Sequence, residues 1–208
     1  MNFYSEKTQV KHILNVFNKA SQSELIDGAS WYKEAQIFSE HLNELFKVES
    51  PVKIAGIISA LSPAVNWERN KVDAQNLLAL YTSTGGNEEE ILKGKFGTYK
   101  NNVRKAIEIL NLKHATKKKV GVILRGKTGY KTESFFYNIY DVNSEEVTID
   151  RHAVKVANNV YKGGSVALSE KKYRLSERAY IKASKKVGLK PYQLQAVVWV
   201  TYRRLRGL

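Results

Sequence analysis

The chain has 208 residues, of which 43% are hydrophobic, and this is enough for one domain of good size or for two small lobes. It carries 34 lysine and arginine residues against 20 acidic residues, so its formal net charge is +14. A balance this basic suits a polyanionic partner, most simply nucleic acid. Cysteine is absent, which excludes disulfides, thiol catalysis, cysteine-ligated zinc and cysteine-bound iron–sulfur clusters.

The sequence offers no segment of the kind that enters a membrane. No apolar run approaches the roughly 20 residues that span a bilayer. The N-terminus, residues 1–7, lacks the apolar core of a signal peptide. We therefore expect a cytoplasmic protein with no membrane partner, associated with the nucleoid if its partner is DNA.

Hydrophobic patterns predict an all-α chain. Val10, Ile13, Leu14 and Phe17 follow the spacing of one helix face. Ser50 followed by proline predicts a cap and the first position of a central, nearly apolar helix. The predicted helices span residues 6–19, 30–46, 51–61, 70–81, 88–92, 101–110, 118–124, 131–140, 152–161, 169–187 and 192–205.

The most distinctive segment runs from residue 124 to residue 157. It places Gly126 and Gly129 in a turn between two predicted helices, and Lys131 at the start of the second. Asp150 follows 19 residues later, at the start of another predicted helix. One helix and a loop fit in that interval, so the amine and the carboxylate can return to the same cleft. Glycines let backbone amides approach a phosphate, and the helix N-terminus that follows favours negative charge.

This segment resembles the helix-hairpin-helix DNA glycosylase superfamily, which includes endonuclease III and oxoguanine glycosylase. The matching residues are Gly126, Gly129, Lys131 and Thr132, followed by Ile149, Asp150, Arg151 and His152. The hairpin is one residue longer than the usual form, and the cysteine-bound iron–sulfur cluster of the endonuclease III branch is absent. The likeness is weaker over the rest of residues 50–205, and residues 1–48 carry no motif that we can place.

The resemblance implies an all-α, two-lobe fold and a DNA N-glycosylase that excises a damaged or modified base. One lobe would hold residues 50–145 and the other residues 1–49 with 146–208. Lys131 and Asp150 would face the cleft between them as catalytic residues, without a cofactor or a metal. Asp150 would stabilise the cationic sugar or orient the nucleophile, and Lys131 would attack C1′, which adds a lyase activity through a Schiff base. The partner would be duplex DNA with a flipped base, bound by a monomer.

The predicted DNA contacts come from three regions. The loop of residues 62–67 is the candidate wedge that fills the space left by a flipped base. Trp31, Tyr32 and Tyr130 are aromatic candidates for the base pocket, and packing is the ordinary alternative for each. The predicted DNA-binding residues are Arg125, Gly126, Lys127, Thr128, Gly129, Tyr130, Asn66, Trp67, His152 and Arg203.

Asp150 and Lys131 each also admit a simpler role. Asp150 can serve only as a helix N-cap, which is a common role for aspartate. Lys131 can serve only as a phosphate contact, with water as the nucleophile. Two further functions fit the same residues: a viral enzyme that transfers a group onto a DNA base with the glycosidic bond intact, and a non-catalytic DNA-binding module.

Overall fold

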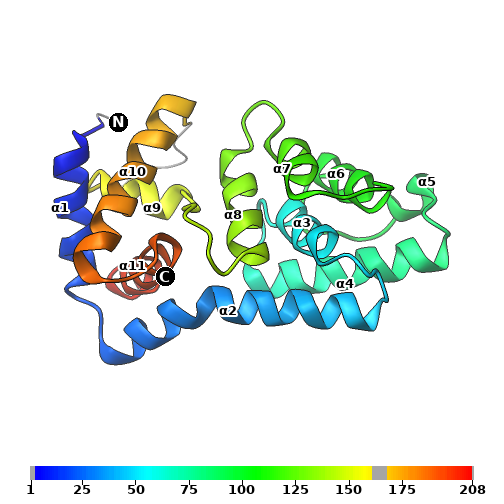
Figure 1. Cartoon of the computed structure of the whole chain (residues 1–208), viewed down its shortest axis with the longest axis horizontal. Helices are drawn as coiled ribbons and strands as arrows, with labels where there is room; N and C mark the ends of the chain where they lie inside the picture. Colours follow the sequence, from blue (N-terminus) through cyan, green and yellow to red (C-terminus); the bar gives the residue numbers. More distant parts are fainter. Residues whose placement is uncertain (1–2, 161–167, 208) are drawn as a thin grey trace. The chain divides into compact units, whose positions relative to one another are not determined.

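The computed structural model describes residues 3–160 and 168–207, and within these ranges it consists of α-helices and loops (Figure 1). The predicted all-α class is thereby confirmed. The helices are α1 (Glu6–Phe17), α2 (Gln22–Leu45), α3 (Pro51–Leu61), α4 (Trp67–Ser83), α5 (Glu88–Ile91), α6 (Lys100–Leu110), α7 (Lys117–Arg125), α8 (Tyr130–Tyr140), α9 (Arg151–Ala157), α10 (Glu170–Val187) and α11 (Pro191–Leu205).

The chain divides into two compact units. Unit 1 comprises Met1–Glu34 and Asp141–Leu208, and unit 2 comprises Ala35–Tyr140. Both divisions lie at helices: one within α2 and the other at the end of α8. Each unit has its own set of buried apolar side chains.

Unit 2 is built around α3. Every residue from Val52 to Leu61 is buried except Lys53, because α3 is apolar nearly all round and contacts α4, α6, α7 and α8. A Cβ atom at Gly56 would lie 2.6 Å from Cγ1 of Val120 on α7. Glycine at this position therefore lets α7 pack closely against α3.

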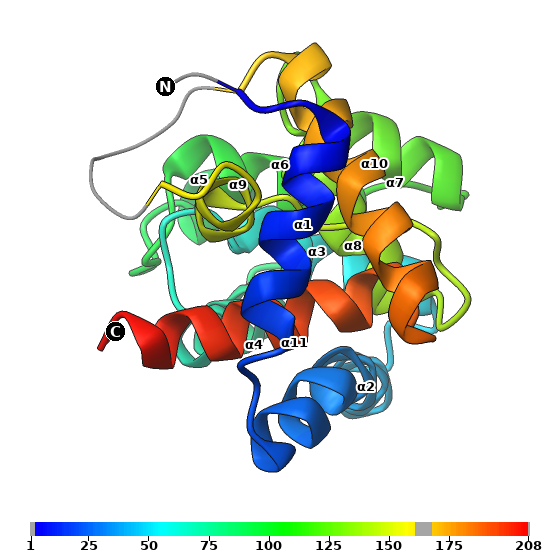
Figure 2. The same cartoon turned by 90° about the vertical axis from the view of Figure 1, so that its left-hand side faces the viewer.

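Unit 1 packs α1, α9, α10 and α11 together, as Figure 2 shows from the side of α1. Ile13, Tyr180 and Val197 are fully buried in its core. A Cβ atom at Gly28 would lie 2.4 Å from the Cα atom of Val197. The first half of α2 can approach α11 this closely only because residue 28 has no side chain.

Several boundaries differ from the sequence prediction, and those of α2 and α9 differ most. Helix α2 begins at Gln22 and not at residue 30, and the unit boundary falls at residues 34–35, whereas we expected it near residue 49. The physical reason is that the second half of α2 packs into unit 2: Ala35 and Leu42 are fully buried, and the Gln36 amide donates to the carbonyl oxygen of Asn138 at 3.0 Å. Helix α9 ends at Ala157, and the predicted end at residue 161 lies outside the described residues.

None of the described helices combines the length and the apolar character that a membrane span requires.

Candidate functional site

The turn between α7 and α8 requires glycine at two positions. Gly126 has a φ of +46°, a left-handed conformation that glycine adopts readily. At Gly129 a Cβ atom would lie 2.3 Å from the carbonyl oxygen of Leu124 and 2.7 Å from that of Arg125. Both neighbours are backbone atoms, so no side-chain movement can make room. The hairpin is therefore a tight turn, and residues 126–128 in it are exposed.

Several backbone amides of this turn are open. The glycine amides are already used, since they donate to the carbonyl oxygens of Val122 and Arg125 at 3.0 and 2.6 Å. In contrast, the amides of Lys127, Thr128 and Lys131 donate to no group within residues 3–160 and 168–207. The last of these lies in the first turn of α8. Open amides beside a helix N-terminus are the arrangement that binds a phosphate oxygen.

Cationic side chains lie both at the start of α7 and in the turn that follows this helix. Residues 117–131 include six cationic side chains and no acidic one: Lys117, Lys118, Lys119, Arg125, Lys127 and Lys131. The first three open α7, whose first turn has no acidic residue. Cations at a helix N-terminus oppose the helix dipole, by about 0.3–1 kcal/mol for a surface charge. Two of these lysines have partners within unit 2: Lys117 lies over the rings of Tyr137 and Tyr140, and the Lys119 ammonium donates to the carbonyl oxygen of His114 at 3.3 Å.

Arg125 and Tyr130 are held against one another across the turn. The Arg125 guanidinium lies 5.3 Å from the Tyr130 ring centroid. Its Nε atom is also 3.7 Å from a carboxylate oxygen of Glu133 on α8. Both predicted contacts thus take part in the internal structure of the turn, and Tyr130 is half-buried.

Lys105 was missed in the sequence analysis. It lies on α6, and its ammonium donates to the carbonyl oxygen of Leu124 at 3.0 Å. A Cβ atom at Gly126 would lie 3.4 Å from the same ammonium. Lys105 therefore satisfies the C-terminal end of α7 and adds a cation beneath the turn. Its separation of 19 residues from Leu124 left no local signal that could have revealed it.

Lys131 lies in the first turn of α8 with an exposed side chain. Within the described ranges its ammonium forms no hydrogen bond or ion pair. It is therefore open to a phosphate. Burial is what activates a lysine amine as a nucleophile, so its exposure supports the phosphate contact more directly than the covalent role.

Asp150 is the N-cap of α9, the simpler of the two roles expected from the sequence. Its Oδ1 atom accepts hydrogen bonds from the backbone amides of His152 and Ala153 at 2.9 and 2.8 Å. Its Oδ2 atom accepts none within residues 3–160 and 168–207. The cap therefore fixes the carboxylate through one oxygen and leaves the other oxygen for a ligand.

His152 carries a buried nitrogen without a partner. Its Nδ1 atom has no hydrogen-bond partner among the described residues. Its Nε2 atom lies 3.3 Å from Nε of Arg151, which can only donate. Nε2 is consequently the acceptor, and the neutral ring holds its proton on Nδ1, where no described residue offers an acceptor.

Burial favours the neutral form of His152. Burial lowers the pKa of His152, and Asp150 opposes this effect. The neighbouring cations Arg151, Lys155 and Arg203 lower the pKa further. Because Nδ1 is buried, the part of the ring that can meet a ligand is its Nε2 side.

Arg203, in the last turn of α11, is a further cation near His152. It is exposed, and its guanidinium lies 4.7 Å from the ring centroid of Trp199. The ring of His152 lies 5.7 Å from that of Tyr202 on the same helix. Unit 1 thus gathers Asp150, His152 and Arg203 at the start of α9 and the end of α11.

The predicted wedge residues have structural roles. Asn66 caps α4, because its Oδ1 atom accepts from the amide of Arg69 at 2.8 Å. The Trp67 ring packs edge-on against Phe38 with centroids 5.8 Å apart, and it is half-buried. The loop before them has a left-handed residue, Ala64, with a φ of +70°. That conformation is strained for alanine, so the loop is held in a defined shape.

Tyr32 belongs to the core of unit 1. Its side chain is buried, and its hydroxyl donates to Oγ1 of Thr148 at 2.9 Å. Its ring lies edge-on to the rings of Trp31 and Tyr192. Packing therefore accounts for the position of Tyr32.

Lys131 belongs to unit 2 and Asp150 to unit 1, so a cleft that holds both residues stays a prediction. Among the described residues, no group of three or more His, Asp or Glu side chains gathers where it could hold a metal ion.

The protein is therefore an all-helical, two-unit chain with a cationic glycine turn in one unit and a capped carboxylate in the other. It belongs to a family of unknown function, DUF7178, whose pattern matches residues 2–206. No curated protein and no solved structure matches the chain.

Proposed function

We propose that this protein is a DNA glycosylase that removes a modified base from DNA. The observation that carries the proposal is the state of the Asp150 carboxylate. Two backbone amides fix its Oδ1 atom, and its Oδ2 atom has no partner among the described residues. A carboxylate held in this way can face a positively charged intermediate without first having to reorganise.

The chemistry needs such a carboxylate. Cleavage of the bond between C1′ and the base nitrogen leaves the electron pair with the base, and the sugar develops positive charge. Asp150 stabilises that charge or takes the proton of an attacking water.

The glycine turn of unit 2 supplies the DNA contact. Its open amides and the cations at the turn, Arg125, Lys127 and Lys131, suit a phosphodiester backbone. Lys131 either contacts a phosphate or attacks C1′. In the second case the nitrogen loses a proton, the sugar ring opens to an imine, and strand cleavage can follow.

The experiment is a panel of duplexes that each contain one modified base. After incubation, free bases are measured by mass spectrometry, and the masses of the intact DNA strands are measured in the same way. A glycosylase releases a base and leaves an abasic site. Mass added to the strand would instead identify a transferase that acts on the base.

A non-catalytic DNA-binding module is the second candidate, and the complete capping role of Asp150 favours it. Such a module would bind every duplex of the panel and change none of them. In either case affinity should fall steeply with salt, because each phosphate contact releases a counterion. Affinity that is independent of salt would contradict both candidates.

A further inference from the structure

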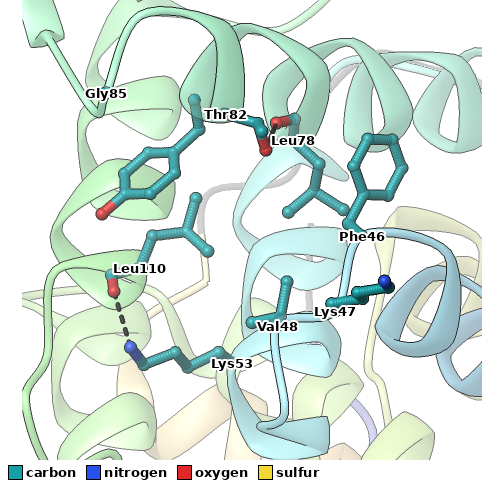
Figure 3. A pocket seen from close by; sticks show the side chains of 9 residues that line it. Phe46, Lys47, Val48, Lys53, Leu78, Thr82, Gly85 and Leu110 are labelled. Atoms are coloured by element: carbon teal, nitrogen blue, oxygen red, sulfur yellow. Dashed lines mark hydrogen bonds between the residues drawn. The ribbon is translucent and has the colours of Figure 1, made fainter.

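Unit 2 has a second concave site, at a different place from the glycine turn (Figure 3). It is an open pocket of about 440 Å³, formed where α2 ends, α3 begins, and α4 and α6 end. Its lining is mixed: Phe46, Val48, Leu78 and Leu110 contribute apolar atoms, Tyr81 and Thr82 contribute hydroxyls, and Lys53 lies at its edge. This volume is in the range of small-molecule sites, about 300–1,000 Å³.

Lys53 is the unusual member of the lining. It is the one charged residue of α3, whose other residues after Pro51 are buried. Its ammonium donates to the carbonyl oxygen of Leu110 at 2.6 Å, as the dashed line in Figure 3 shows. Burial lowers the pKa of Lys53, because the charged form loses part of its hydration.

Capping of α6 explains only part of this arrangement. An ammonium has three N–H donors, and the bond to Leu110 uses one. Within the described part of the chain, Lys53 forms no ion pair and no other hydrogen bond. Lys53 is thus a partly desolvated cation at the edge of the pocket, with two donors left. The described part of the protein supplies no negative charge to pair with it.

The charge of the lining selects the sign of the ligand. The pocket is lined by two lysines, Lys47 and Lys53, and by no acidic residue. In Figure 3, Lys53 and Leu110 lie on one side of the pocket, and Phe46 and Lys47 on the other. A ligand there meets positive charge, hydroxyl groups and a few apolar side chains, and no carboxylate belongs to the lining.

We propose that this pocket binds a small organic anion, whose acidic group contacts Lys53 and whose apolar body lies against Phe46, Leu78 and Leu110. The acidic group is a carboxylate or a phosphate monoester, and the same contacts fit either one. None of the residues proposed for base excision lines this pocket. The proposal of an anion site can therefore be correct or wrong independently of the proposed glycosylase activity.

Two naphthalene probes test the proposal in the full-length protein. 8-Anilinonaphthalene-1-sulfonate carries an anionic group on an apolar body, and N-phenyl-1-naphthylamine has the same body without the charge. We expect Lys53→Met to weaken binding of the sulfonate about tenfold or more, the usual effect of losing a hydrogen bond to a charged group. The uncharged probe should bind both proteins equally.

Lys93→Met is the matched control, because Lys93 is an exposed lysine of unit 2 outside the pocket lining. It should leave both affinities unchanged. Equal weakening of sulfonate binding by the two variants would overturn the proposal, because general surface charge would then explain it.

A measurement on the unmodified protein does not depend on the stability of a variant. Amide chemical shifts, followed during titration with the sulfonate, should change mainly at residues 46–53, 78–85 and 110–111. Changes confined to other residues would overturn the site. Hexanoate and thymidine 5′-monophosphate then compete for it, and the one that displaces the probe identifies a carboxylate or a phosphate ligand. Failure of both to displace a probe would contradict the proposed ligand class.

Discussion

The Oδ1 atom of Asp150 accepts a hydrogen bond from the backbone amide of Ala153 at 2.8 Å, three residues along the chain. The contact begins α9 in the manner of a standard N-cap. It also fixes the orientation of the carboxylate. The same side chain therefore serves as the cap through Oδ1 and as the proposed catalytic group through Oδ2. Substitutions can separate the two roles, because asparagine retains a capping oxygen and loses the charge.

We predict that Asp150→Ala lowers the free energy of unfolding by about 1 kcal/mol, the usual effect of removing an N-cap. Asp150→Asn should lower it by less, because its side-chain oxygen still accepts from the amides of His152 and Ala153. Urea unfolding followed by circular dichroism gives both values. Equal destabilisation by alanine and asparagine would show that the charge, and not the cap, stabilises α9.

Gly129→Ala should lower the free energy of unfolding by more than the loss of glycine's backbone freedom explains, because the new Cβ atom overlaps backbone atoms. The added Cβ atom would lie 2.3 Å from the carbonyl oxygen of Leu124, and backbone atoms must move to relieve that overlap. Local strain of this kind is on the order of 1–3 kcal/mol. Gly85→Ala is the control for backbone conformation alone, because Gly85 has a φ of +61° and nothing lies within 4 Å of its Cβ position, whereas Gly129 has no positive φ. Equal unfolding midpoints for the two variants would contradict the steric origin of the effect.

The local signals of the sequence predicted much of the helical fold. Ser50 with Pro51 marked the start of α3, and the glycines marked the turn before α8. The start of α2 also has a local signal, which the sequence analysis missed: Ser21 and Glu24 form a capping pair, in which the Ser21 amide donates to Glu24 at 2.8 Å and the Glu24 amide donates back at 3.3 Å. That pattern is a known helix start.

The tertiary contacts had no such local signal. Lys53 reaches Leu110 across 57 residues, and Lys105 reaches Leu124 from another helix. Helical periodicity states which face of a helix is buried, but it does not state which other helix covers that face. The unused oxygen of Asp150 likewise depends on a rotamer, which residue spacing does not determine.

Lys131→Gln separates the two roles of Lys131. If Lys131 is the nucleophile, borohydride traps a covalent protein–DNA adduct during turnover, and the variant should lose the adduct because an amide cannot form an imine. DNA binding should weaken by less than about 1–3 kcal/mol, because glutamine can still donate to a phosphate. Lys93→Gln should trap normally.

Two different results for Lys131 would each decide the point. Base release without any trapped adduct assigns Lys131 to phosphate binding and makes water the nucleophile. Trapping that persists in Lys131→Gln moves the nucleophile to another amine, and Lys127 is the first residue to test.

The ion pair of Glu24 with Arg204 should make unit 1 sensitive to acid. Hydrogen bonds from the Arg204 side chain lower the pKa of Glu24 from 4.5 to about 2, with N–O distances of 2.7 and 3.0 Å. Because the folded-state pKa is depressed, the stabilisation is fully present above the unfolded pKa near 4.5. It is lost as the pH falls toward about 2.

Thermal unfolding between about pH 6 and about pH 2 checks this expectation. Glu24→Gln should lower the melting temperature at the upper end of the range and have a smaller effect at the lower end, where Glu24 becomes protonated in the folded state as well. Glu34→Gln, at an exposed position on the same helix, should change little throughout. A Glu24→Gln effect that is the same at both ends of the range would show that the ion pair does not contribute.

Base release by Asp150→Asn tests the central claim most directly. On the duplex that the unmodified protein processes, free base is measured by mass spectrometry under single-turnover conditions for the unmodified protein, Asp150→Asn and Asp27→Asn, which removes an exposed charge from the same unit. A charge that stabilises the transition state is worth about 100-fold or more in rate. We therefore predict that Asp150→Asn releases the base at least about 100-fold more slowly, while Asp27→Asn matches the unmodified protein. Release by Asp150→Asn at the unmodified rate would show that Asp150 only caps α9, and it would contradict the proposed mechanism.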